Sequence, residues 1–203
     1  MSMRLGVTGG IGSGKSYVCR ILANDFGIPV YNCDIRARIL TLSDPDVVAR
    51  LTELDPAIYT SEGELDKARL ASYLFASDDN YQRVNAIIHP AVRLDLHDWL
   101  ALRPTAPIVA VESAILYESH FDTEVDRVLF VDAPLNVRIQ RIAQRDGLDS
   151  EQIAQRMKRQ QPDQARQWAD HIVLNDGQAD LHAQLHKILS SISTSETLTP
   201  LDT

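Results

Sequence analysis

The chain lacks most features of a secreted, membrane or nucleic-acid-binding protein. It has two cysteines, Cys19 and Cys33, whose spacing fits neither a disulfide framework nor a metal site. No apolar run approaches the about 18 residues that span a bilayer, and the first strand begins too early to leave room for a signal peptide. The net charge of −8 disfavours nucleic acid, whose binding depends on clustered Lys and Arg. We therefore expect a cytoplasmic protein with no membrane or nucleic-acid partner.

Short apolar runs alternate with helical stretches, a pattern typical of a parallel sheet with helices on both faces. The five expected strands cover residues 4–8, 29–32, 107–111, 127–131 and 171–174. With 203 residues, 44% of them apolar, the chain is long enough to bury the core of one such domain. The expected fold is α/β, a parallel five-stranded sheet flanked by helices.

Two helical segments interrupt this alternation. Residues 35–104 contain no convincing buried strand, and residues 136–166 are rich in Arg and Gln. Residues 193–203 have little to bury, so we expect them to form a disordered tail. The expected core of this single domain, residues 1–203, comprises 1–34, 105–135 and 167–192.

A phosphate-binding loop is predicted between the first strand and the first helix. Residues 9–16 fit Gly-x-x-x-x-Gly-Lys-[Ser/Thr], in which glycines let backbone N–H groups approach phosphates and the helix start adds positive charge. Lys15 is expected to reach the β- and γ-phosphates, and Ser16 to help hold Mg²⁺. The pattern and its flanks favour nucleotide binding over an ordinary Gly-rich turn. The residues expected at the nucleotide are Gly10, Ile11, Gly12, Ser13, Gly14, Lys15, Ser16 and Tyr17.

Further absences narrow the class of nucleotide-binding protein. The chain has no Asn-Lys-x-Asp motif, with which GTPases recognise guanine. It also has no apolar run that ends in adjacent acids, as motor ATPases usually do. A small-molecule kinase needs a carboxylate near the acceptor hydroxyl and arginines over the transferring phosphoryl group. Asp34, just past the second strand, either has that role or caps the helix that follows. Arg138, Arg141 and Arg145 share one helical face without nearby acids, which fits either a phosphate-covering lid or a solvated surface.

Over nearly its whole length the chain resembles the dephospho-CoA kinase family. The resemblance depends on six motifs in the family's order, at residues 7–16, 33–38, 87–92, 112–118, 141–146 and 169–175. Two positions depart from the family pattern. Asn32 stands where the family often has an Asp, and Ala114 stands where a Pro is common.

The resemblance implies a three-layer P-loop kinase that transfers the γ-phosphoryl group of ATP, with Mg²⁺, to the ribose 3′-hydroxyl of dephospho-CoA. Lys15, Asp34 and Arg141 would be catalytic, and Arg145 and Asn175 would join the ATP site. Another nucleoside or nucleotide kinase, or a switch that hydrolyses ATP slowly, remains an alternative. The expected state is a monomer or weak homo-oligomer.

The resemblance also implies where the acceptor binds. Residues 35–104 would form its docking wall, and residues 136–166 would form the lid. Glu112 either holds Mg²⁺ with Ser16 or caps a turn, and His89 is either a substrate contact or a structural residue before a proline. The residues expected to bind dephospho-CoA are Asp34, Arg38, His89, Leu116 and Glu118.

Overall fold

The computed structural model describes residues 2–146, 153, 157 and 162–196. Its contacts divide the chain into two compact units. The core unit comprises Met1–Val30 and Thr105–Thr203, and the helical unit comprises Tyr31–Pro104. The limits of the helical unit lie close to those expected for the inserted segment, 35–104.

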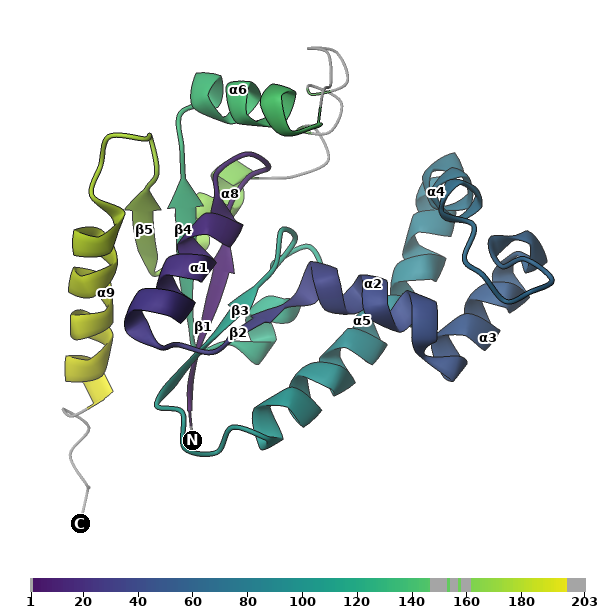
Figure 1. The fold of residues 1–203 in the computed structure, drawn as a ribbon, viewed down its shortest axis with the longest axis horizontal. Coiled ribbons are helices and arrows are strands. Elements are labelled where there is room, and N and C mark those ends of the chain that lie inside the picture. Colours follow the sequence, from purple (N-terminus) through teal and green to yellow (C-terminus); the bar gives the residue numbers. More distant parts are fainter. Residues whose placement is uncertain (1, 147–152, 154–156, 158–161, 197–203) are drawn as a thin grey trace. The chain divides into compact units, whose positions relative to one another are not determined.

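A five-stranded sheet runs through the fold in the order β2-β3-β1-β4-β5 (Figure 1). Strand β1 pairs in parallel with β3 and β4, and β4 pairs in parallel with β5, so their carboxyl ends meet at one edge. The bounds of the five predicted strands are confirmed to within one residue. The strands are β1 (Met3–Thr8), β2 (Val30–Asn32), β3 (Ile108–Glu112), β4 (Arg127–Asp132) and β5 (His171–Leu174).

Helices α1 (Lys15–Phe26) and α9 (Leu181–Glu196) pack against the sheet in one apolar cluster. Leu22 of α1 and Leu185 of α9 are fully buried there. Gly27 ends α1 in the left-handed conformation and donates its N–H to Leu22 O, as its position after the helical run predicts. Helix α9 continues through Glu196, so the first part of the expected disordered tail, residues 193–203, is helical instead.

The described part of the core unit also includes the helices α6 (Leu135–Asp146) and α8 (Pro162–Trp168), with a 3₁₀ turn at Phe121–Glu124. Arg166 of α8 donates to Asp132 at the end of β4, at 2.9 Å. Most of the expected lid between α6 and α8 lies outside the described residues, as do residues 197–203. Among the described helices, none is both long and apolar enough to cross a membrane.

The helical unit buries its own core, which includes Leu51, Ile58, Val84 and Ile87. Beyond the end of β2, its described residues form helices joined by turns, with one isolated bridge, Tyr59–Leu65, as the largely helical pattern of the sequence predicts. Its elements are α2 (Cys33–Ser43), α3 (Pro45–Leu54), η1 (Pro56–Ile58), α4 (Lys67–Ala76) and α5 (Asp78–Ala101).

The first turn of α2 carries Asp34, but a different residue caps this helix. The Asn32 side chain accepts the Ile35 N–H at 2.8 Å, so the alternative reading of Asp34 as the cap is wrong. Asn and Asp cap helices equally well, and Asn32 therefore keeps this function although it lacks the acid common in the family. Asp34 itself is exposed, and its charge is favourable at a helix start.

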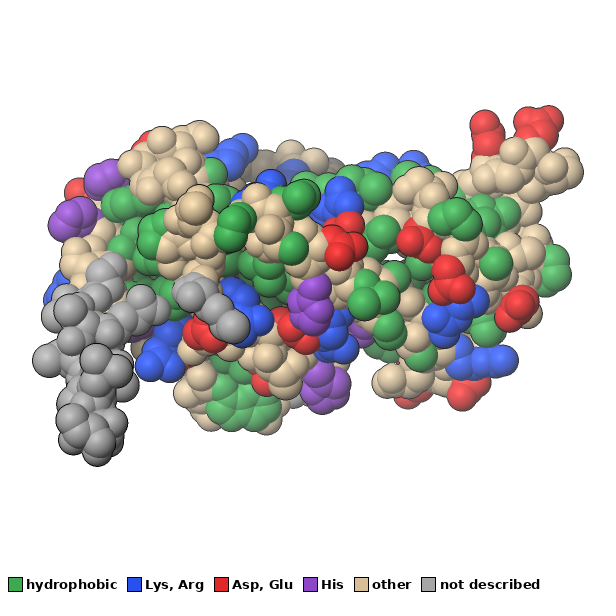
Figure 2. All heavy atoms as spheres, turned by 90° about the horizontal axis from the view of Figure 1, so that it is seen from below, with side chains coloured by type: hydrophobic (Ala, Val, Ile, Leu, Met, Phe, Trp, Pro, Cys, Tyr) green, Lys and Arg blue, Asp and Glu red, His purple; other side chains and the backbone are tan. Residues whose placement is uncertain are grey.

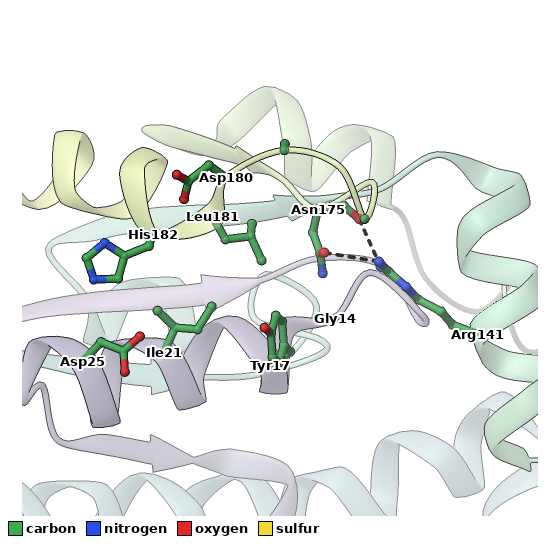
Figure 3. Close-up of a pocket in the computed structure, with 11 residues that line it drawn as sticks. Gly14, Tyr17, Ile21, Asp25, Arg141, Asn175, Asp180, Leu181 and His182 are labelled. Atoms are coloured by element: carbon green, nitrogen blue, oxygen red, sulfur yellow. Dashed lines mark hydrogen bonds between the residues drawn. The ribbon is translucent and has the colours of Figure 1, made fainter.

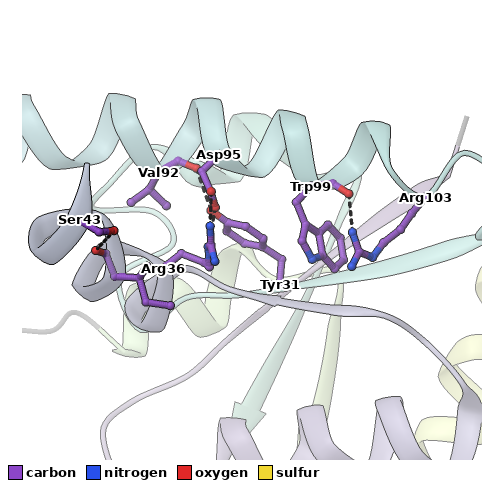
Figure 4. Close-up of polar contacts among 8 residues, drawn as sticks. Tyr31, Arg36, Ser43, Val92, Asp95, Trp99 and Arg103 are labelled. Carbon is purple, nitrogen blue, oxygen red and sulfur yellow. Dashed lines mark hydrogen bonds and ion pairs between the residues drawn. The ribbon is translucent and has the colours of Figure 1, made fainter. Parts of the chain in front are cut away.

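An ion pair fixes α2 to α5 within the helical unit (Figure 4). Arg36 donates to both carboxylate oxygens of Asp95, with Nε to Oδ2 at 2.7 Å, and the Tyr31 hydroxyl donates to the same Oδ2 at 2.7 Å. The Arg36 hydrogen bond holds the pKa of Asp95 below its usual range, although burial opposes it. Because this pKa is lowered on folding, the pair stabilises the unit at neutral pH, and that stability is lost as pH falls through the folded-state pKa.

Candidate active site

The predicted phosphate loop lies at the carboxyl edge of the sheet, between β1 and α1. Gly12 and Gly14 have φ values of 80° and 91°, which favour glycine. Neither position has room for a side chain. A Cβ on Gly12 would lie 2.6 Å from the Arg138 carbonyl oxygen, and one on Gly14 would collide with the Asn175 side-chain amide. The loop backbone at these two positions therefore packs directly against α6 and against the residue that follows β5.

The two predicted magnesium ligands, Ser16 and Glu112, are in direct contact. The Ser16 hydroxyl donates to Glu112 Oε1 at 2.6 Å, and Glu112 is 4% exposed at the end of β3. A hydroxyl and a carboxylate are hard oxygen donors, and Mg²⁺ is usually held by one or two such groups together with substrate phosphates. The residues present therefore fit this ion.

Cys19, one turn further along α1, is a neighbour of Glu112 that the sequence did not reveal. Burial raises the pKa of the Cys19 thiol far above its usual range, and the charge of Glu112 and a hydrogen bond to it act in the same direction. The thiol therefore stays protonated and donates to Glu112. The only signal in the sequence for this contact is that Cys19 lies three residues after Ser16, because residues three apart share a helix face.

Arg141, predicted to be a catalytic lid arginine, and Asn175, predicted at the ATP site, meet at the loop. Arg141 Nη1 donates to Ser13 O at 3.2 Å and to Asn175 O at 3.1 Å, and Nη2 donates to Asn175 Oδ1 at 3.2 Å. Asn175, which is 5% exposed, donates to Ser13 O at 2.8 Å. This network joins α6, the end of β5 and the loop.

The other two arginines of the α6 face differ from each other. Arg138 Nε donates to Ile11 O at 2.9 Å, so this side chain also lies on the loop. Arg145 instead forms an ion pair with Asp146 at 2.7 Å, and its side chain is 63% exposed. The expectation of an arginine face without nearby acids is therefore wrong for Arg145. Its contact with ATP stays a prediction.

A cavity of about 560 Å³ opens beside the Gly14 end of the loop (Figure 3). Tyr17 and Ile21 of α1 line one side, and Leu181 and His182 of α9 line the other. Arg141 closes the end nearest the loop. Its volume is typical of small-molecule sites.

Three predicted acceptor residues, Asp34, Arg38 and His89, belong to the helical unit, where Asp34 and Arg38 are exposed and His89 is half-buried within α5. Leu116 and Glu118 follow β3 in the core unit. Leu116 is fully buried and packs against β1, with its Cδ2 placed 3.1 Å from where a Cβ on Gly6 would lie. Its role as a substrate contact stays a prediction.

Glu118 is exposed and stays a candidate acceptor contact. It borders a smaller cavity of about 210 Å³ together with Tyr117 and Trp168. The two aromatic rings meet edge to face, with centroids 5.1 Å apart. Burial raises the pKa of Tyr117 to about 12, so its hydroxyl stays protonated at neutral pH.

The chain is similar to known proteins over most of its length. The family model described as dephospho-CoA kinase matches residues 3–180. The chain is 42% identical to the dephospho-CoA kinase of Porphyromonas gingivalis over 192 residues, 94% of each chain. The crystal structure of the Thermus thermophilus protein TT1252 matches with a TM-score of 0.84 at 30% identity, covering 98% of this chain and 99% of that one.

A dephospho-CoA kinase from Campylobacter jejuni has the same fold, with a TM-score of 0.66 at 24% identity, covering 97% of this chain and 100% of that one. The strand order, the phosphate loop and the flanking helices thus form a P-loop kinase fold. Because the family match extends over most of the chain, the protein belongs to the dephospho-CoA kinase family.

Proposed function

We propose that the protein transfers the γ-phosphoryl group of ATP to the ribose 3′-hydroxyl of dephospho-CoA, giving CoA and ADP. The observation that carries this proposal is the phosphate loop with Ser16 hydrogen-bonded to Glu112, in a chain of this family. The acceptor oxygen attacks the γ-phosphorus, and the bond from that phosphorus to the β–γ bridging oxygen breaks. ADP leaves with the electron pair, and the hydroxyl proton passes to the Asp34 carboxylate.

The chain's own groups act mainly by position and charge, because the transition state of phosphoryl transfer is loose. Backbone N–H groups of residues 10–16 would hold the phosphate oxygens. The ATP nucleoside would occupy the cavity between α1 and α9, with Arg141 and Asn175 at its phosphate end. The helical unit would carry the acceptor, with Asp34, Arg38 and His89 as its contacts.

We propose a cytoplasmic location.

Bound Mg²⁺ would neutralise phosphate oxygens, and Ser16 and Glu112 would hold it. Glu112→Gln keeps the side-chain shape and an oxygen that accepts from Ser16, but removes the charge. We expect the Mg²⁺ concentration for half-maximal activity to rise by about 10- to 100-fold, the range for altered metal-site partners. The measurement is initial rate against free Mg²⁺ at saturating ATP.

The matched control for Glu112→Gln is Glu53→Gln, an exposed acid on α3. This control should leave the Mg²⁺ dependence unchanged. An unchanged dependence in Glu112→Gln as well would mean that Glu112 only orders the turn after β3.

The function itself is tested by ADP release with MgATP and one acceptor at a time. We expect release to be stimulated by dephospho-CoA and not by nucleosides or nucleoside monophosphates. The product should be CoA, identified by mass. Stimulation by nucleosides alone would replace the proposal with another small-molecule kinase, and slow release independent of any acceptor would indicate a nucleotide switch.

A further inference from the structure

Two arginines of α6 contact opposite ends of the phosphate loop. Arg141 donates to the carbonyl oxygen of Ser13, near the end where the loop enters α1. Arg138 donates to the carbonyl oxygen of Ile11, and its guanidinium lies directly against the Cα of Gly10, at the end where the loop leaves β1. The two side chains therefore face different parts of a bound polyphosphate.

The direction of the polyphosphate along the loop follows from two other contacts. The nucleoside-sized cavity opens at Gly14, beside Arg141. The Lys15 ammonium lies at the other end, where it donates to Gly9 O at 2.7 Å. Since the lysine of this motif reaches the β- and γ-phosphates, the γ-phosphoryl group belongs at the Gly9–Gly10 end, which is the Arg138 end.

The Arg138 guanidinium also has capacity left for a ligand. Its Nη2 is buried and has no hydrogen-bond partner among the residues that the structure describes. Burial lowers the pKa of Arg138, with the nearby acids Asp132 and Asp163 opposing this effect. A buried charged donor without a partner is costly, and an anion at this end of the loop would satisfy it.

We propose that Arg138 is the arginine that contacts the transferring γ-phosphoryl group, while Arg141 binds the diphosphate and nucleoside end of the nucleotide. This inference takes only the identity of the acceptor from the proposed function. As the bond from the γ-phosphorus to the bridging oxygen breaks, negative charge develops on that oxygen of the leaving ADP, and the N–H groups of Arg138 would hold the oxygens of the γ-phosphoryl group in place beside it.

The test compares a nucleotide that has a γ-phosphate with one that does not. Binding of MgADP and of a Mg-bound non-hydrolysable ATP analogue is measured by calorimetry for Arg138→Gln and Arg141→Gln. We expect Arg138→Gln to weaken the triphosphate analogue by about 10- to 100-fold, as for a lost hydrogen bond to a charged group, and MgADP by less than about twofold. Arg141→Gln should weaken both nucleotides.

Arg138→Lys keeps the charge and should recover part of the triphosphate affinity. The matched control is Arg127→Gln, because this exposed arginine at the start of β4 is outside the site; both affinities should be unchanged. Equal weakening of both nucleotides by Arg138→Gln, or no weakening at all, would overturn the assignment. Should Arg138→Gln not fold, the same comparison on Arg138→Lys decides. Neither binding measurement contains dephospho-CoA, so its result does not depend on which acceptor the protein uses. The ADP-release experiment tests the acceptor separately.

Discussion

Replacing Lys15 by alanine is expected to lower phosphoryl transfer below about one thousandth of the wild-type rate. The loss exceeds the 10²–10³-fold typical of one neutral donor at a reacting group, because Lys15 supplies a full positive charge at the β- and γ-phosphates. In the structure its ammonium donates to Gly9 O, at the end of the loop that follows β1. The measurement is CoA formation under saturating MgATP and dephospho-CoA.

The control for this change is Lys187→Ala on α9, where the lysine is exposed. Both variants should keep the wild-type thermal unfolding midpoint, since neither side chain is part of the apolar core. Activity within tenfold of wild type in Lys15→Ala would contradict the use of this loop for the transferred phosphate.

Replacing Asp34 by asparagine is expected to lower kcat by roughly 10²- to 10⁴-fold, the range for a lost general base. The structure shows that this substitution leaves the N-terminal cap of α2 in place, which the sequence alone did not settle. Asn32, not Asp34, caps α2, so the helix keeps its cap and loses only a favourable charge near its start. The measurement is kcat and KM for dephospho-CoA, with binding of MgADP expected to stay unchanged.

Asp46→Asn is the matched control, because Asp46 is an exposed acid in the first turn of α3 within the same unit. It should lower neither kcat nor affinity. Near-normal turnover in Asp34→Asn would show that Asp34 has no role as the base, and that its charge serves only the start of α2.

The fold was predictable because its strands are local, strongly patterned signals. Runs such as residues 108–111 are apolar and mostly β-branched, and Gly27 follows a helical run at the position where a left-handed residue ends a helix. The cap of α2 was less predictable. Asn32 and Asp34 both have side chains that accept backbone N–H groups, and only the backbone conformation decides which one does so.

The residues of the site were predictable where one motif specifies them. They were less predictable where the packing of separate elements decides which side chains contact the loop. Helical periodicity places Arg138, Arg141 and Arg145 on one face, but seven residues advance a helix by about 10 Å. The arginine face of α6 is therefore longer than the part of the helix that contacts the phosphate loop. Of these three arginines, only Arg138 and Arg141 have hydrogen bonds to the loop among the described residues. The burial of Leu116 was not predictable from local patterning, because this side chain packs against the glycine of a distant strand, Gly6. Apart from Asp34, which its place after the second strand also indicated, the acceptor residues came from the family resemblance.

The packing of Arg138 against Gly10 links two positions that are far apart in the chain. Unlike Gly12 and Gly14, Gly10 does not have a positive φ, so its backbone would accept any residue. A Cβ there would instead meet the tip of the Arg138 side chain. An alanine at position 10 would therefore displace the flexible tip of the Arg138 side chain, and a shorter side chain at position 138 would leave room for that alanine.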